Sequence, residues 1–298
     1  MDILTYLEKM PGLYICLCGI LGLLVGSFAN VVILRLPVMM KHQWLEQCAS
    51  LSEPDGEATS IEIEPDQEAR FNLAYPPSHC PKCQHRIHSW ENIPVISYLF
   101  LHGRCSACGQ PIPIRYPVIE AACGLLSVIV AWHFGFGWQS VTALVLTWAL
   151  LIASVIDFDH QLLPDSITLP LVWLGLLLSL FNVFVDSHTA IIGAAVGYLS
   201  LWTVFHLFKL LTGKEGMGYG DFKLLAVFGA WLGWQHLLTV ILLSSLVGAC
   251  VGIMMITLRG HDRQIPIPFG PYLATAGWVT LLWGNAILAA YMHWMGIR

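Results

Sequence analysis

Long apolar stretches recur through this chain and constrain its fold more than any other feature. Eight segments are each close to the roughly 20 residues that a helix needs to cross the ~30 Å hydrocarbon core of a bilayer. They are residues 12–34, 116–134, 138–156, 166–185, 189–210, 221–235, 237–258 and 271–292. The sixth is the shortest and is rich in Gly and Trp. The pattern predicts an all-α polytopic membrane protein with about eight transmembrane helices.

The overall composition agrees with a membrane location. Hydrophobic residues make up 56% of the 298 residues and charged residues only 11%, whereas about a quarter of a soluble globular domain is charged. The first apolar segment is too long for a cleavable signal peptide, and acidic Asp2 and Glu8 precede it beside Lys9. We therefore expect this segment to be the first transmembrane helix, within residues 1–35.

The distribution of basic residues predicts the orientation. If the N-terminus lies outside and the chain crosses eight times, only Lys9 and Arg298 of the 14 Lys and Arg residues remain outside. Such a bias follows the positive-inside rule. It places the turns that carry Asp157 and Asp221 on the same, cytoplasmic side of the membrane.

Residues 36–115 form the long polar stretch of the sequence and predict a cytoplasmic insert, followed by a seven-helix core over 116–298. Within the insert, residues 45–69 contain eight acidic residues and no basic one. This composition favours a solvated, mobile insertion. The alternative is that the acidic run attracts a basic segment of a substrate.

The insert also contains two Cys-x-x-Cys motifs, which supply Cys80, Cys83, Cys105 and Cys108. Two such motifs at this spacing can give four thiolates to one tetrahedral zinc ion. A cytoplasmic location argues against stable disulfides, although redox chemistry and free thiols remain alternatives. We expect a structural zinc that folds a small insert, because a closed four-thiolate site leaves no position for substrate.

Two aspartates lie where apolar runs meet polar turns. Asp157 follows an unbroken apolar run, and Asp221 ends the glycine-rich turn Gly216–Asp221 before another. Charged groups at the edge of hydrocarbon are costly and are functional candidates by default. The alternative for Asp221 is that it caps the helix that follows it, while Asp159 and Asp165 are better explained as turn and cap residues. The pair predicts a two-carboxylate site for acid–base chemistry.

These residues together resemble a known family. GMGYGD at Gly216–Asp221 matches the GxGD signature of intramembrane-type aspartyl proteases. With IDFDHQLLPD, the two Cys-x-x-Cys motifs, and the segments ENIPVISYL, RYPVIE and PIPFGPYL, the chain resembles the bacterial type IV prepilin leader peptidases. An ordered set of this kind is far more specific than a GxGD motif alone.

The resemblance implies a function. It implies that Asp157 and Asp221 are the catalytic pair, and that the substrates are type IV prepilins and type II secretion pseudopilins, cleaved after Gly. It also implies N-methylation of the new N-terminal residue with S-adenosylmethionine, by an enzyme of the bacterial inner membrane whose active site faces the cytoplasm. We expect membrane lipid but no nucleic acid as a further partner.

Two other functions compete with this one on the residues alone. Paired aspartates in membrane helices also relay protons, so a proton-coupled transporter is the main alternative. Against it, both aspartates fall at one interface rather than at the middle of a span, where transport sites usually lie. A zinc-stabilised membrane scaffold that recruits partners through the insert is the third possibility.

Overall fold

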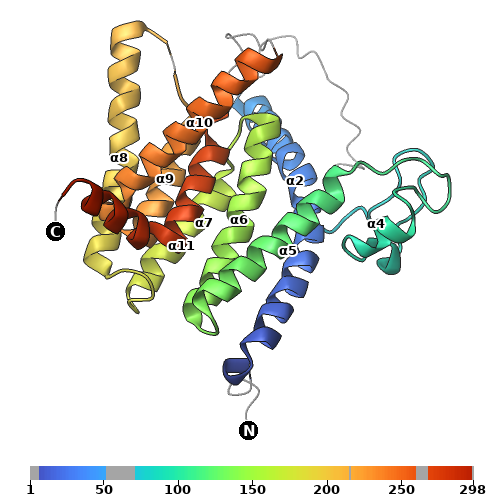
Figure 1. The fold of residues 1–298 in the computed structure, drawn as a ribbon. Helices are drawn as coiled ribbons and strands as arrows, with labels where there is room; N and C mark the ends of the chain where they lie inside the picture. Colours follow the sequence, from blue (N-terminus) through green and yellow to red (C-terminus); the bar gives the residue numbers. More distant parts are fainter. Residues whose placement is uncertain (1–6, 52–70, 215, 260–267, 297–298) are drawn as a thin grey trace. The chain divides into compact units, whose positions relative to one another are not determined.

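The computed structural model describes residues 7–51, 71–214, 216–259 and 268–296. In these ranges the regular structure is helical, and pairing between extended residues is limited to the isolated bridges His79–Arg86 and Arg104–Pro111. The predicted all-α class is therefore confirmed (Figure 1). The chain divides into two compact units, of which one comprises residues 15–129 and the other residues 1–14 and 130–298.

The unit of residues 15–129 is built on two long helices, α2 (Pro11–Leu51) and α5 (Arg115–Phe134). Their close packing depends on small residues. A Cβ atom added to Gly22 would lie only 2.3 Å from the Ser127 hydroxyl oxygen, and one added to Gly26 would lie 2.8 Å from the Cα atom of Glu120. Small residues that let helix backbones approach in this way are typical of membrane helix pairs.

Between these helices the unit contains the described part of the polar insert. It holds the two Cys-x-x-Cys turns, the 3₁₀ helix η1 (Ser89–Asn92) and the short helix α4 (Ile96–Phe100). Helix α2 continues to Leu51, well past the predicted end of the first span, because the only breaker in residues 35–51 is Pro37. Of the acidic run, residues 52–69 lie outside the described residues. The predicted division into residues 1–35, 36–115 and 116–298 stays a prediction.

The second unit is a bundle of apolar helices. Its elements are α6 (Trp138–His160), α7 (Asp165–Ser179), α8 (Ser187–Thr212), α9 (Tyr219–Leu232), η2 (Trp234–His236), α10 (Leu237–Arg259) and α11 (Gly270–Trp294). Helix α9 packs against α7, α8, α10 and α11, and every residue from 221 to 232 except Lys223 is buried. This helix is therefore the core of the bundle (Figure 1).

Two contacts hold α9 in its place. Gly229 faces Gly193 of α8 so closely that a Cβ atom added to it would lie 2.0 Å from the Gly193 carbonyl oxygen. On α9, the indole N–H of buried Trp231 donates a hydrogen bond of 2.9 Å to the carbonyl of Leu171 in α7. Surrounding helices thus supply the apolar environment of α9, which explains why this segment can be short.

All eight predicted apolar segments correspond to helices, but they differ in length. Among the described residues, six helices are long and apolar enough to cross a membrane, namely Pro11–Ser50, Arg115–Phe134, Trp138–His160, Ser187–Thr212, Trp234–Met255 and Gly270–His293. Helices α7 and α9 have only 15 and 14 residues. The chain is thus a multi-pass membrane protein in which α7 and α9 are shorter than the other apolar helices that the structure describes.

Candidate functional sites: an aspartate pair and a four-cysteine centre

Asp157 lies in the last turn of α6, where the apolar run of that helix ends. Only 6% of the residue is exposed. Gln161 ends the helix in a left-handed conformation, and its N–H donates to the Asp157 carbonyl. The Asp157 side chain accepts a 3.1 Å hydrogen bond through Oδ2 from the backbone N–H of Gly270, the first residue of α11. The carboxyl group is therefore held at the point where α6 meets α11.

Asp221 lies in the first turn of α9 and is 7% exposed. Its own N–H donates to the Gly218 carbonyl at 3.3 Å, so the glycine turn and the start of the helix are joined by the backbone. The side chain of Asp221 accepts a hydrogen bond from the backbone N–H of Gly218, the residue that precedes the helix. The carboxyl groups of Asp221 and Asp157 are near enough to interact electrostatically.

Glycine is needed at two positions around this aspartate pair. A Cβ atom added to Gly220 would lie 2.6 Å from Cβ of Leu163, which is in the turn after Asp157. One added to Gly270 would lie 2.5 Å from Oδ2 of Asp157. Both distances are below the separation of non-bonded atoms. The two glycines therefore let the three chain segments that form the site approach one another.

The role of Gly270 could not be read from the apolar pattern. The signal in the sequence is the Gly-Pro pair at the start of a predicted span, which places an uncrowded N–H at a helix N-terminus. Asp165, by contrast, is 55% exposed in its side chain, and its Oδ1 pairs with Nζ of Lys223 at 2.5 Å. This ion pair links α7 to α9 on the surface rather than within the site.

The four cysteines form a second cluster, in the unit of residues 15–129. Their Sγ atoms all lie within 4.8 Å of one another. The Cys80–Cys108 and Cys83–Cys105 sulfur pairs are 3.8 and 4.0 Å apart. A tetrahedral zinc ion with bonds of about 2.3 Å requires sulfur–sulfur separations of roughly 3.8 Å. The cysteine geometry therefore fits a four-thiolate zinc centre.

The two Cys-x-x-Cys turns have equivalent backbones. In each, the N–H of the first cysteine bonds to a carbonyl five residues later, and the residue after the second cysteine has a positive φ, of 59° at Gln84 and 69° at Gly109. Backbone N–H groups of Cys83 and Lys82 lower the pKa of Cys80 to about 6. These N–H groups favour the thiolate form of Cys80, the form that binds a metal.

Glu91 ties the second cysteine turn to η1. Its side chain is only 5% exposed, and it accepts hydrogen bonds from the Ser106 hydroxyl and, at 2.8 Å, from the His88 N–H. His85 Nε2 lies 3.3 Å from the same carboxyl group. The Ser106 and His88 hydrogen bonds lower the pKa of Glu91, so it is a buried anion at neutral pH. In the sequence, the signal for Glu91 is only its place at the start of the segment ENIPVISYL.

The fold is apolar and helical, and it brings two buried aspartates together. These features define a membrane protein of the paired-carboxylate class, and aspartic peptidases use a pair of carboxyl groups of this kind. The chain belongs to the type IV leader peptidase family. The model of that family matches residues 144–253, and the model of the bacterial peptidase A24 N-terminal domain matches residues 20–134. The two matches cover the aspartate pair and the four cysteines, respectively.

Full-length relatives carry the same description. The chain is 56% identical to the "Prepilin leader peptidase/N-methyltransferase" of Stutzerimonas stutzeri over 97% of each chain. It is 55% identical to the protein of that name from Pseudomonas aeruginosa over the whole of both chains. A relative from Legionella pneumophila with this name is 43% identical over 93% of this chain and 94% of its own. No solved structure matches the chain.

Proposed function

We propose that this chain is a membrane endopeptidase that removes the basic leader from type IV prepilins and type II pseudopilins after Gly. It then N-methylates the new N-terminal residue with S-adenosylmethionine. The observation that carries the peptidase proposal is the meeting of buried Asp157 and Asp221 at the junction of α6, α9 and α11. The names of the full-length relatives support both activities.

Two interacting carboxyl groups account for peptide hydrolysis. The pair shares one proton, so one aspartate is a carboxylate and the other a carboxylic acid. The carboxylate takes a proton from a water molecule, whose oxygen bonds to the scissile carbonyl carbon, while the acid donates a hydrogen bond to the carbonyl oxygen. The carbon–nitrogen bond then breaks, and the nitrogen leaves as an amine with a proton from the pair. Gly270 orients Asp157 through its N–H.

Methylation follows on the amine that cleavage exposes. The neutral amine forms a bond from its nitrogen to the methyl carbon as the carbon–sulfur bond of the donor breaks. The electron pair of that bond stays on sulfur, which becomes a neutral thioether, and the methylated nitrogen releases its extra proton to water. The donor supplies an activated methyl group, and the protein must bind the donor and hold the amine beside it.

We assign the metal a structural role. Cys80, Cys83, Cys105 and Cys108 would hold zinc, whose charge neutralises clustered thiolates and joins the two cysteine turns. Four thiolates complete the tetrahedron, so the site offers no position for a substrate. The described insert is small and has few buried apolar residues, so the metal would supply much of its folding free energy.

We place the enzyme in the bacterial inner membrane with the aspartate pair facing the cytoplasm. The excess of basic residues on that side in the eight-crossing topology supports this orientation. A cytoplasmic boundary site suits a substrate whose basic leader is in water and whose apolar helix is in lipid. The transporter alternative has no support, since the relatives reported above are all named as peptidases.

A cleavage assay tests the proposal. The wild-type protein, Asp157→Asn and Asp221→Asn are incubated in detergent with a peptide that has a basic leader, a Gly-Phe junction and an apolar helix. We expect each variant to lose about 100-fold or more of the cleavage rate, as acid–base groups contribute that much. Asp159→Asn, which removes an exposed carboxylate two residues from Asp157, is the matched control and should cleave normally.

The second activity is measured separately on a peptide that already begins with Phe. Wild-type protein with S-adenosylmethionine should add the mass of one methyl group to it, and so should both aspartate variants, because no cleavage is needed. Cleavage that survives in Asp157→Asn and Asp221→Asn would contradict the assigned role of the pair. Absence of methylation by folded wild-type protein would contradict the second activity alone.

A further inference from the structure

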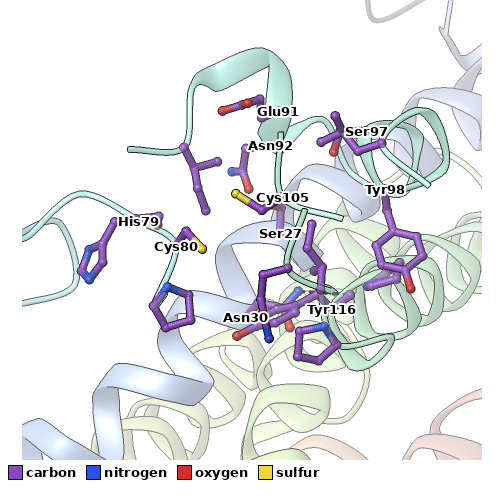
Figure 2. Close-up of a pocket in the computed structure, with 18 of the residues that line it drawn as sticks. Ser27, Asn30, His79, Cys80, Glu91, Asn92, Ser97, Tyr98, Cys105 and Tyr116 are labelled. Atoms are coloured by element: carbon purple, nitrogen blue, oxygen red, sulfur yellow. Dashed lines mark hydrogen bonds between the residues drawn. The ribbon is translucent and has the colours of Figure 1, made fainter. Parts of the chain in front are cut away.

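A cavity of about 490 Å³ lies in the unit of residues 15–129, and neither Asp157 nor Asp221 is among its lining residues. Its walls come from α2, from α5, from the segment around η1 and α4, and from the two cysteine turns. Figure 2 shows side chains from all four regions around it, among them Asn30, Cys80, Asn92 and Tyr98. The volume is within the ~300–1,000 Å³ typical of small-molecule sites.

Two carboxyl groups, of Glu91 and Glu120, line this cavity. Glu120 is 9% exposed, and its carboxyl group accepts a 2.8 Å hydrogen bond from the Val95 N–H and another from the Ser27 hydroxyl. A carboxylate can accept about four hydrogen bonds, so Glu120 has acceptor capacity left for a ligand. Glu91, whose side chain is 5% exposed, also lines the cavity but is already bound to its three neighbours.

The one basic side chain of the lining that is always charged, Arg35, already forms hydrogen bonds within the protein. Arg35 is the only Lys or Arg among the described residues that line the cavity. Its guanidinium donates to the carbonyl oxygens of Asn72 at 2.9 Å and Pro76 at 2.6 Å. Because buried charges require a partner of opposite sign, a cavity with two carboxyl groups and an engaged guanidinium favours a ligand that carries positive charge.

The rest of the lining suits a flat ring system. The cavity has four prolines, namely Pro81, Pro111, Pro113 and Pro117, and the rings of Tyr98 and Tyr116. The Tyr98 ring is fixed in place by close packing on Gly103, where a Cβ atom would lie 2.9 Å from it. Tyrosine faces bind both planar heterocycles and cations that cannot donate hydrogen bonds.

Backbone strain occurs at Val95, whose N–H bonds to the lining residue Glu120. Val95 has φ 60° and ψ −45°, a conformation that is a genuine outlier for a β-branched residue. The hydrogen bond from its N–H to Glu120 holds it there and ties the η1–α4 segment to α5. Such strain persists only where the surroundings impose it, and it concentrates at ligand-binding sites.

We propose that this cavity is the methyl-donor site, with the positively charged end of S-adenosylmethionine beside Glu120 and its adenine against the proline and tyrosine wall. The inference rests on the methyltransferase part of the proposed function and names the site for it. Sulfonium and ammonium groups match the carboxyl groups, and adenine matches the flat wall. The amide groups of Asn30 and Asn92 supply donors and acceptors for the polar edges of the ligand.

Equilibrium binding to the full-length, zinc-loaded protein in detergent tests this site. Titration calorimetry with S-adenosylmethionine compares wild type with Glu120→Gln, which keeps the shape and removes the charge. We expect affinity to fall about tenfold or more, the effect of losing one charge-assisted contact. Glu46→Gln changes an exposed glutamate of α2 in the same unit and should bind as wild type does. Zinc content and thermal unfolding check that each variant is folded.

A second measurement does not depend on any variant. Wild-type protein is irradiated with radiolabelled S-adenosylmethionine, and the labelled peptides are identified by mass spectrometry. Label within residues 27–35 or 78–120 supports the site, whereas label confined to residues 130–298 overturns it. In the titration, an affinity of Glu120→Gln equal to that of the wild type also overturns it. If the wild-type protein binds no S-adenosylmethionine, both this site and the proposed methyltransferase activity are overturned. If the wild-type protein does not cleave the prepilin-like peptide, the peptidase proposal is contradicted instead.

Discussion

Replacing Gly270 by alanine tests how tightly the aspartate pair is positioned. The new Cβ atom would lie 2.5 Å from Oδ2 of Asp157, whereas Cβ atoms essentially never approach another atom below 3.0 Å. Either the carboxyl group or the start of α11 must therefore move by at least about 0.5 Å. Leu163 Cδ1, at 3.2 Å from the same Cβ position, limits the space into which it can move.

The expected cost to catalysis follows from this displacement. A misplacement of about 1 Å can reduce a rate about 100-fold, so a shift of roughly half to one ångström predicts a 10- to 100-fold loss. This corresponds to about 1.4–2.7 kcal/mol in the activation free energy. The loss should appear in kcat rather than KM, because Gly270 contacts the proposed catalytic carboxyl group of Asp157 rather than a substrate side chain.

Peptidase kinetics with the prepilin-like peptide measure the effect. The matched control is Gly248→Ala in α10, where the new Cβ atom would meet the Tyr272 ring at an ordinary 3.4 Å. Methylation of a peptide that already begins with Phe should persist in Gly270→Ala and shows that the protein is folded. A wild-type kcat in Gly270→Ala would refute the argument that Gly270 sets the position of Asp157.

Two further predictions concern stability and the metal. Trp231→Phe removes the donor to the Leu171 carbonyl at a site that is 1% exposed. It should lower the free energy of unfolding of the bundle by about 1–3 kcal/mol, measured by unfolding in denaturing detergent. An unchanged stability would mean that this hydrogen bond is not needed. Cys105→Ser should lose most of the one zinc per chain measured by mass spectrometry, whereas Cys48→Ser, outside the cluster, should retain it. Equal zinc in both variants would contradict the four-cysteine centre.

Much of the fold could be predicted because the relevant signals are local. An apolar run of about 20 residues predicts a helix in a membrane wherever it occurs, and all eight runs are helical here. The cysteine centre was predictable for a similar reason, since each Cys-x-x-Cys turn is built from consecutive residues. The structure brings the four sulfur atoms together as that spacing indicated.

Helix length was the weaker part of the prediction. Hydropathy alone does not distinguish a helix buried by protein from one that faces lipid. Helix α9 is apolar because α7, α8, α10 and α11 surround it, and it is shorter than a full crossing. The predicted segment 166–185 is likewise longer than α7, which ends at Ser179.

The sequence by itself determined the class of the protein and predicted the residues of its candidate sites, which are Asp157, Asp221 and the four cysteines. Only the tertiary structure decided which backbone amide holds Asp157, since Gly270 lies 113 residues away. The same holds for the hydrogen bond that joins Glu120 to Val95 across 25 residues. The physical reason is that residue types and spacing fix local conformation, whereas contacts between distant segments depend on how the helices pack.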